Sequence, residues 1–157
     1  MADNYIRLAD TIASDEGKAY ITIDGQNREM FELQSLDASL SLTVISRRML
    51  GRKMTQHKVV GAEGTGNATL YFMNSTQLNN TIEYIKTGRW KSVKVQVKNE
   101  DPQSTIGKQE VVLENVIFES IPVTKVAEGD DPITFDSGFT FDGIENLESF
   151  QLPINYR

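Results

Sequence analysis

Two stretches decide the fold: ASLSLTV, residues 38–44, and TGNATLYFM, residues 65–73. In each, apolar and short polar side chains alternate with the period of two that a half-buried β-strand requires. The polar faces carry Ser, Thr and Asn, whereas a strand face in bulk solvent more often carries Lys and Glu. We therefore expect these faces to line an internal space, and the residues that define them are Ser39, Ser41, Thr43, Asn67 and Thr69.

Outside these two strands the pattern is also mainly extended. Residues 19–23, 92–98 and 133–141 alternate in the same way, and residues 110–126 predict one long or two short strands. One helix is predicted, over residues 74–87, because Leu78, Ile82 and Ile85 form a single apolar stripe that ends before Gly88. We expect this helix to lie on one face of a sheet.

Charge is segregated along the chain. Residues 38–62 contain no acidic side chain and hold five cations together with His57, the only histidine. Residues 127–156 contain no Lys or Arg and hold seven carboxylates, from Glu128 to Glu148. A solitary compact protein gains little from this layout, whereas copies that place a basic loop on a neighbour's acidic segment gain register and specificity.

Composition limits the class of protein. At 157 residues the chain is predicted to be one domain, with an N-terminal arm (1–17), an extended basic loop (46–64) and an acidic C-terminal segment (127–157). The absence of cysteine excludes disulfides, thiol nucleophiles and thiolate metal sites, and it fits assembly in a reducing cytosol. The net charge of −6 argues against general affinity for nucleic acid or anionic membranes.

No catalytic or metal-binding constellation is evident. His57 is surrounded by cations and has no orienting carboxylate near it in sequence, and one histidine without cysteine leaves only carboxylates as further zinc ligands, which disfavours a zinc site. GAEGTG, residues 61–66, lacks the Lys-Ser/Thr and the following helix of a phosphate-binding loop, so hinge glycines are the simpler interpretation. The acidic segment matches no calcium loop, and the basic loop lacks the aromatics that stack on nucleic-acid bases.

Residues 47–71 carry a resemblance to a known family. RRMLGRKM (47–54) and HKVVGAEGTGNATLY (57–71) resemble the tail-tube proteins of contractile phages, in the branch typified by the defective Bacillus phage PBSX. IEYIKTG (82–88), LENVIF (113–118) and ITFD (133–136) are similar to further parts of that family. The first 20 residues and the last ten show no match.

The resemblance implies an antiparallel β-sandwich or barrel with one flanking α-helix and a long inter-strand loop, related to the ring protein of type VI secretion. It implies a structural subunit, without catalysis or cofactor, that forms hexameric rings stacked into a hollow tube. Each copy would contribute about four strands, and about 24 tilted strands enclose a channel roughly 40 Å wide. The Ser, Thr and Asn faces named above would line that channel.

The resemblance also implies partners. The tube would contact a tail sheath, baseplate or tail-tip proteins and a tape-measure protein, with DNA only as passing cargo and no membrane binding by the subunit. It would belong to a virion tail or an R-type bacteriocin particle assembled in the bacterial cytoplasm. The basic loop would reach the adjacent ring through Arg47, Arg48, Met49, Arg52, Lys53, Met54, His57 and Lys58. The expected acidic counter-surface is Glu128, Asp130, Asp131, Asp136 and Asp142.

Two other functions are weighed against this one. A β-sandwich that binds carbohydrate requires exposed aromatics on one face, for which only Trp90 and Tyr71 are candidates. A small hydrolase is disfavoured by the lack of cysteine and of a second histidine. The mass of the protein in solution distinguishes the tube subunit from the carbohydrate-binding module, since a tube protein forms rings or tubes as its concentration rises.

Overall fold

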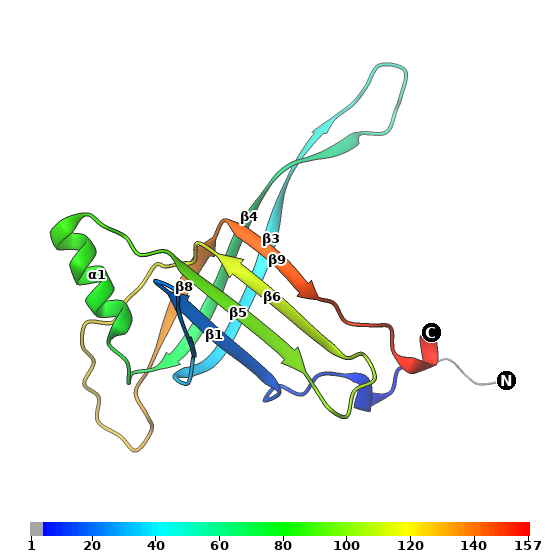
Figure 1. Ribbon diagram of the computed structural model, residues 1–157. Helices are drawn as coiled ribbons and strands as arrows, with labels where there is room; N and C mark the ends of the chain where they lie inside the picture. Colours follow the sequence, from blue (N-terminus) through cyan, green and yellow to red (C-terminus); the bar gives the residue numbers. More distant parts are fainter. Residues whose placement is uncertain (1–4) are drawn as a thin grey trace.

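The chain forms two antiparallel sheets that cross face to face, in a computed structural model that describes residues 5–157 (Figure 1). The five-stranded sheet has the order β2 (Gln26–Glu29), β1 (Gly17–Ile23), β5 (Val93–Glu100), β6 (Lys108–Glu114) and β9 (Gly143–Glu148). The four-stranded sheet has the order β3 (Leu33–Arg47), β4 (Gln56–Tyr71), β8 (Thr134–Phe141) and β7 (Ile117–Phe118). Short 3-10 turns η1 (Leu8–Asp10) and η2 (Ile154–Tyr156) lie near the two ends.

The core lies between the two sheets. Alternate residues of β1, β5 and β6 meet alternate residues of β4 and β8, as the period-two patterns predict. Phe139 lies between Phe118 and Phe141, with ring centroids 5.7 and 6.3 Å away. The mainly β sandwich with one flanking helix is confirmed.

The predicted basic loop, residues 46–64, is mostly strand, and this boundary was wrong. β3 continues to Arg47 and β4 begins at Gln56, so only residues 48–55 connect them, with Gly51 at φ +82°. Figure 1 shows the outer half of this hairpin projecting well beyond the body. The strands continue because β-branched residues such as Val44 and Val59 pair across them, past an irregularity in register at Thr43/Val44.

The helix is confirmed and lies at the periphery. α1 (Thr76–Thr87) ends at Gly88, which adopts φ +76° and donates its N–H to the Tyr84 carbonyl at 2.7 Å. None of its residues is buried, and Figure 1 places it beside the sheets rather than across one of them. The described part of the chain has no helix long and apolar enough to span a membrane.

The two terminal segments are partly as predicted. The acidic C-terminal segment, residues 127–157, contains β8 where an extended stretch is predicted, and it also contains β9, which is not predicted; these strands pair with β4 and β6. The predicted N-terminal arm is irregular from Tyr5 to Glu16 apart from η1, and its first four residues lie outside the described range.

Candidate functional site

The outer face of the four-stranded sheet gathers all five predicted lining residues. Cross-strand register places Ser39 opposite Thr65, Ser41 opposite Glu63 and Thr43 opposite Gly61. Residues in register share a face, so this face continues through Asn67 and Thr69 into Asp136 and Thr140 of β8. Over residues 35–43, 61–71 and 134–140 its polar side chains are hydroxyls, one amide and the carboxylates of Asp37, Glu63 and Asp136, without Lys or Arg. Ile117 of β7 adds an exposed apolar side chain opposite Thr140. Farther out, on the projecting hairpin, the same strands carry Lys58 and Arg47.

Two of these carboxylates are held in place. Asp136 Oδ1 accepts the Thr69 Oγ1 hydroxyl at 2.6 Å, and Asp37 Oδ1 accepts the Asn67 backbone N–H at 2.9 Å. Two of the three carboxylates on this face are thus oriented by hydrogen bonds. Such a surface attracts no phosphate backbone, because it offers negative charge and no cation.

The opposite face of the same sheet explains the Gly-Thr-Gly motif. Gly64 and Gly66 are in register with Phe141 and Phe139, and a Cβ on either glycine would overlap the facing phenyl ring. These glycines therefore allow close packing in the core of a strand. The interpretation as hinge glycines was wrong, because sequence alone did not reveal that residues 61–66 belong to β4.

The basic residues lie together on the projecting hairpin. Arg47, His57 and Lys58 are at the outer ends of β3 and β4, and Arg48, Arg52 and Lys53 are in the connecting segment. All are exposed, and the methionines among them are exposed as well, Met54 to 78%. The structure therefore brings the eight predicted residues of the basic loop into one exposed surface.

The five predicted counter-surface residues are not brought together. Glu128, Asp130 and Asp131 lie in the loop between β7 and β8, whereas Asp136 lies on the hydroxyl-rich face. Asp142 lies between β8 and β9, where its Oδ2 accepts a hydrogen bond from Asn115 Nδ2 at 2.6 Å. The sequence could not distinguish these positions, because strand β8 separates the loop residues from Asp142.

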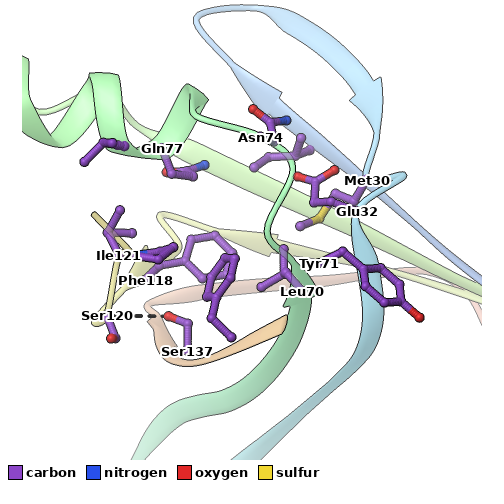
Figure 2. Close-up of a pocket in the computed structure, with 14 residues that line it drawn as sticks. Met30, Glu32, Leu70, Tyr71, Asn74, Gln77, Phe118, Ser120, Ile121 and Ser137 are labelled. Carbon is purple, nitrogen blue, oxygen red and sulfur yellow. Dashed lines mark hydrogen bonds between the residues drawn. The ribbon is translucent and has the colours of Figure 1, made fainter. Parts of the chain in front are cut away.

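A cavity of about 30 Å³ lies between the start of α1 and the sheets (Figure 2). Apolar side chains, including Leu70, Phe118 and Ile121, form most of its wall. Its one carboxylate, Glu32, is paired with Arg28 through two hydrogen bonds of 3.1 Å. The cavity has room for about two water molecules, and it offers a substrate neither space nor an unpaired acid or base.

The remaining sequence candidates for a metal or ligand site are also separated in the described structure. No group of three or more His, Asp and Glu side chains in residues 5–157 is placed to hold a metal ion. His57 is exposed on the hairpin and has no ion pair. Trp90 packs against Tyr84 in a T-shaped contact, with ring centroids 5.6 Å apart.

A polar cluster that sequence analysis missed joins the two terminal segments. Asp10 Oδ1 accepts both the backbone N–H and the hydroxyl of Thr105, at 3.0 and 2.6 Å. The same hydroxyl accepts the Ile154 N–H at 3.1 Å, and Arg157 donates to the Thr105 carbonyl. The hydrogen bonds from Thr105, helped by the charges of Arg7 and Arg157, lower the pKa of Asp10 although its burial opposes this. No short-range motif marked these residues, because the segments are about 50 to 95 positions apart.

The sequence matches a family described as phage tail tube protein, over residues 4–148. The chain belongs to the phage tail tube protein family. This family member is 28% identical over 148 residues to the phage-like element PBSX protein XkdM of Bacillus subtilis strain 168, covering 94% of each chain. It is 30% identical over 150 residues to the uncharacterized protein YqbM of the same organism, covering 92% of this chain and 97% of the relative.

Solved structures share the fold of this tail tube protein. The chain in the cap of the anti-feeding prophage tube superposes with a TM-score of 0.67 at 9% identity, covering 94% of this chain and 96% of that one. A chain of the sheath–tube complex of the extracellular contractile injection system PVC gives a TM-score of 0.60 at 11% identity, covering 84% and 88%. The resemblance to phage tail tubes is therefore confirmed, and the protein is a tail tube subunit.

Proposed function

We propose that this chain forms hexameric rings, stacked into the inner tube of a contractile phage tail or phage-derived bacteriocin, and that it carries no catalysis. The observation that supports this most directly is that the outer face of the four-stranded sheet carries no cation over residues 35–43, 61–71 and 134–140. A channel that conducts DNA must not hold it, and a surface of hydroxyls and carboxylates gives phosphates no cationic partner. We assign this face, including Ser39, Ser41, Thr43, Asn67 and Thr69, to the lumen.

The free edge of the same sheet provides a way to close the tube. β3 pairs only with β4 within the described chain, so one side of its 15 residues is available for hydrogen bonding. An unpaired edge of this length favours the addition of a strand from another copy. At the other edge, β7 covers only two residues of β8. Joining four-stranded sheets edge to edge in six copies gives the 24 strands of the proposed barrel.

The outer face of the five-stranded sheet has the opposite chemistry and would lie outside the tube. Lys94, Lys98 and Lys108 form ion pairs there with Glu114, Glu100, Glu110 and Glu148, at 3.3 to 4.0 Å. A surface whose charges are already paired makes weak polar contacts. Such contacts suit a sheath that must slide over the tube during contraction. Baseplate, tail-tip and tape-measure proteins would be the further partners, with assembly in the bacterial cytoplasm.

Electron microscopy of the purified protein tests this function. We expect rings, and at higher protein concentration tubes, whose end-on views show six-fold symmetry and a stain-filled channel roughly 40 Å wide. Sedimentation should show the shift from subunit to ring over the same concentrations. A strict monomer at every concentration, or filaments without a channel, would overturn the proposal.

A further inference from the structure

The fold pairs some charges and leaves others without a partner. Eight ion pairs join side chains of residues 5–157, and six of them involve Lys91, Lys94, Lys98 or Lys108. None involves the basic tip, which we define as residues 47–58. None involves the acidic turn, which we define as residues 128–131. The strongest runs of opposite charge in the chain therefore remain free for contacts outside it.

The basic tip and the acidic turn cannot neutralise each other within one copy. Figure 1 shows the β3–β4 hairpin projecting at one end of the molecule and the loop between β7 and β8, residues 119–133, extending at the opposite end. We infer that the basic tip of one copy docks on the acidic turn of a second copy in the next ring, an inference that rests on the proposed function. A contact between two different surfaces of identical subunits propagates along an axis rather than stopping at a dimer.

The structure favours the acidic turn over the other predicted acidic residues. The carboxylates of Asp136 and Asp142 are already hydrogen-bonded to Thr69 and Asn115, each at 2.6 Å. Glu128, Asp130 and Asp131 accept no side-chain hydrogen bond from residues 5–157 and are exposed. The nearest cation in sequence, Lys125, donates its Nζ hydrogen to the Thr134 carbonyl at 2.7 Å instead. The turn is thus an uncompensated anionic surface.

Apolar side chains accompany the charges on both surfaces. On the basic tip, Leu50 is fully exposed, and Met49 and Met54, within four positions of it in sequence, are also exposed. On the loop that carries the acidic turn, Val123 is 72% and Val126 is 93% exposed. Exposed apolar groups next to unpaired charge are typical of a protein interface, where apolar burial supplies affinity and charge fixes register.

Paired charge reversals test the docking. The first variant carries Arg48→Glu, Arg52→Glu and Lys53→Glu, and the second carries Glu128→Lys, Asp130→Lys and Asp131→Lys. Because exposed pairs are individually weak, we expect each variant to raise the protein concentration needed for tubes by about ten-fold to a hundred-fold. The variant with all six changes keeps the net charge of −6 and should form tubes at the same protein concentration as the natural chain.

Mixing the two three-residue variants is the sharper measurement. An equimolar mixture should form tubes, because each reversed tip meets a reversed turn and each natural tip meets a natural turn. The control matched to the second variant is Asp15→Lys, Glu16→Lys and Glu29→Lys. It changes the net charge by the same amount, at exposed carboxylates that form no ion pair in the described chain. It should assemble normally and should not rescue the first variant.

The outcomes separate the docking from the proposed function. If the natural chain forms no rings or tubes, the proposed function fails and the docking fails with it. If the natural chain forms tubes but the acidic-turn variant assembles normally, or the mixture does not, the docking alone is wrong. If the tip variant assembles normally while the natural subunit retards a DNA duplex in a gel and the variant does not, the tip binds nucleic acid instead.

Discussion

The outer faces of the two sheets differ in the charged side chains that they carry. The five-stranded sheet carries both signs, and three of its lysines, Lys94, Lys98 and Lys108, are paired with neighbouring glutamates. Over the body of the molecule, residues 35–43, 61–71 and 134–140, the four-stranded sheet carries hydroxyls and a few carboxylates on its outer face but no cation. Both faces have the same alternation and the same backbone geometry. The difference therefore reflects what each face meets, which we propose to be a sheath on one side and passing DNA on the other.

The largest effect is expected on the inner side of the four-stranded sheet. Gly66→Ala places a methyl group against the Phe139 ring and the Asp37 carbonyl, so it should lower the free energy of unfolding by about 2–3 kcal/mol. Gly61→Ala is the matched control, since its Cβ would lie 3.8 Å from Thr43 in ordinary contact on the outer face. Urea unfolding of the two variants measures the difference. Equal stabilities would contradict the packing role of the Gly-Thr-Gly motif.

This packing role shows where sequence reasoning stopped. Period-two alternation was sufficient to predict most strands and the polar faces of Ser39 and Asn67, because these depend on local pattern, whereas the sandwich was implied by the family resemblance and β9 (Gly143–Glu148) was not predicted. The extent of the β3–β4 hairpin was missed because charge-rich residues such as Arg47 and Lys58 are usual in loops. The Asp10–Thr105 contact was also missed, since no local pattern joins residues 95 positions apart.

The second test adds two arginines to the outer face of one sheet or of the other. Ser39→Arg with Thr69→Arg places six-fold rings of cations on the proposed lumen face, whereas Thr22→Arg with Gln96→Arg places the same charge on the five-stranded sheet. Tubes of the first variant should slow the passage of DNA and bind short duplexes at least about ten-fold more tightly at low salt. Tubes of the second variant should bind DNA on the outside without slowing its passage. Duplex binding and ejection or translocation rates measure both effects, and equal retardation by the two variants would refute the assignment of faces.

The third test compares two carboxylates that accept a threonine hydroxyl at the same distance, 2.6 Å. Asp10 is buried and bonded to Thr105, and Asp136 is bonded to Thr69 on the hydroxyl-rich face. Asp10→Asn keeps an oxygen that can accept from Thr105 but removes the charge beside Arg7 and Arg157, so it should loosen both terminal segments, because Thr105 also receives the Ile154 N–H. Proteolysis and hydrogen exchange of residues 5–16 and 150–157 should therefore increase in Asp10→Asn and remain unchanged in Asp136→Asn.

The same test has a defined pH dependence. The folded pKa of Asp10 is lowered, so its contribution to stability is present above the ordinary aspartate pKa of 3.8 and is lost as the pH falls through the lower folded value. Protection of the terminal segments should be equal in the natural chain and in Asp10→Asn once the pH is below that value. A difference that persists in strong acid would show that the carboxylate charge is not what holds the segments.

The smallest effect is expected on the outer face of the five-stranded sheet. Glu148 and Glu110 raise the pKa of Lys108 by accepting its hydrogen bonds, so its contribution is present below the ordinary lysine pKa of 10.5 and is lost as the pH rises through the higher folded value. Lys108→Met should therefore reduce stability only slightly at neutral pH and not at all in strong alkali, as measured by thermal unfolding. Because exposed pairs are weak and screened by salt, the loss should also shrink as salt is added. A loss of stability as large as that of Gly66→Ala would mean that the ion pairs on the outer face of the five-stranded sheet stabilise the fold as much as core packing does. The contrast between the two outer faces would then no longer indicate function.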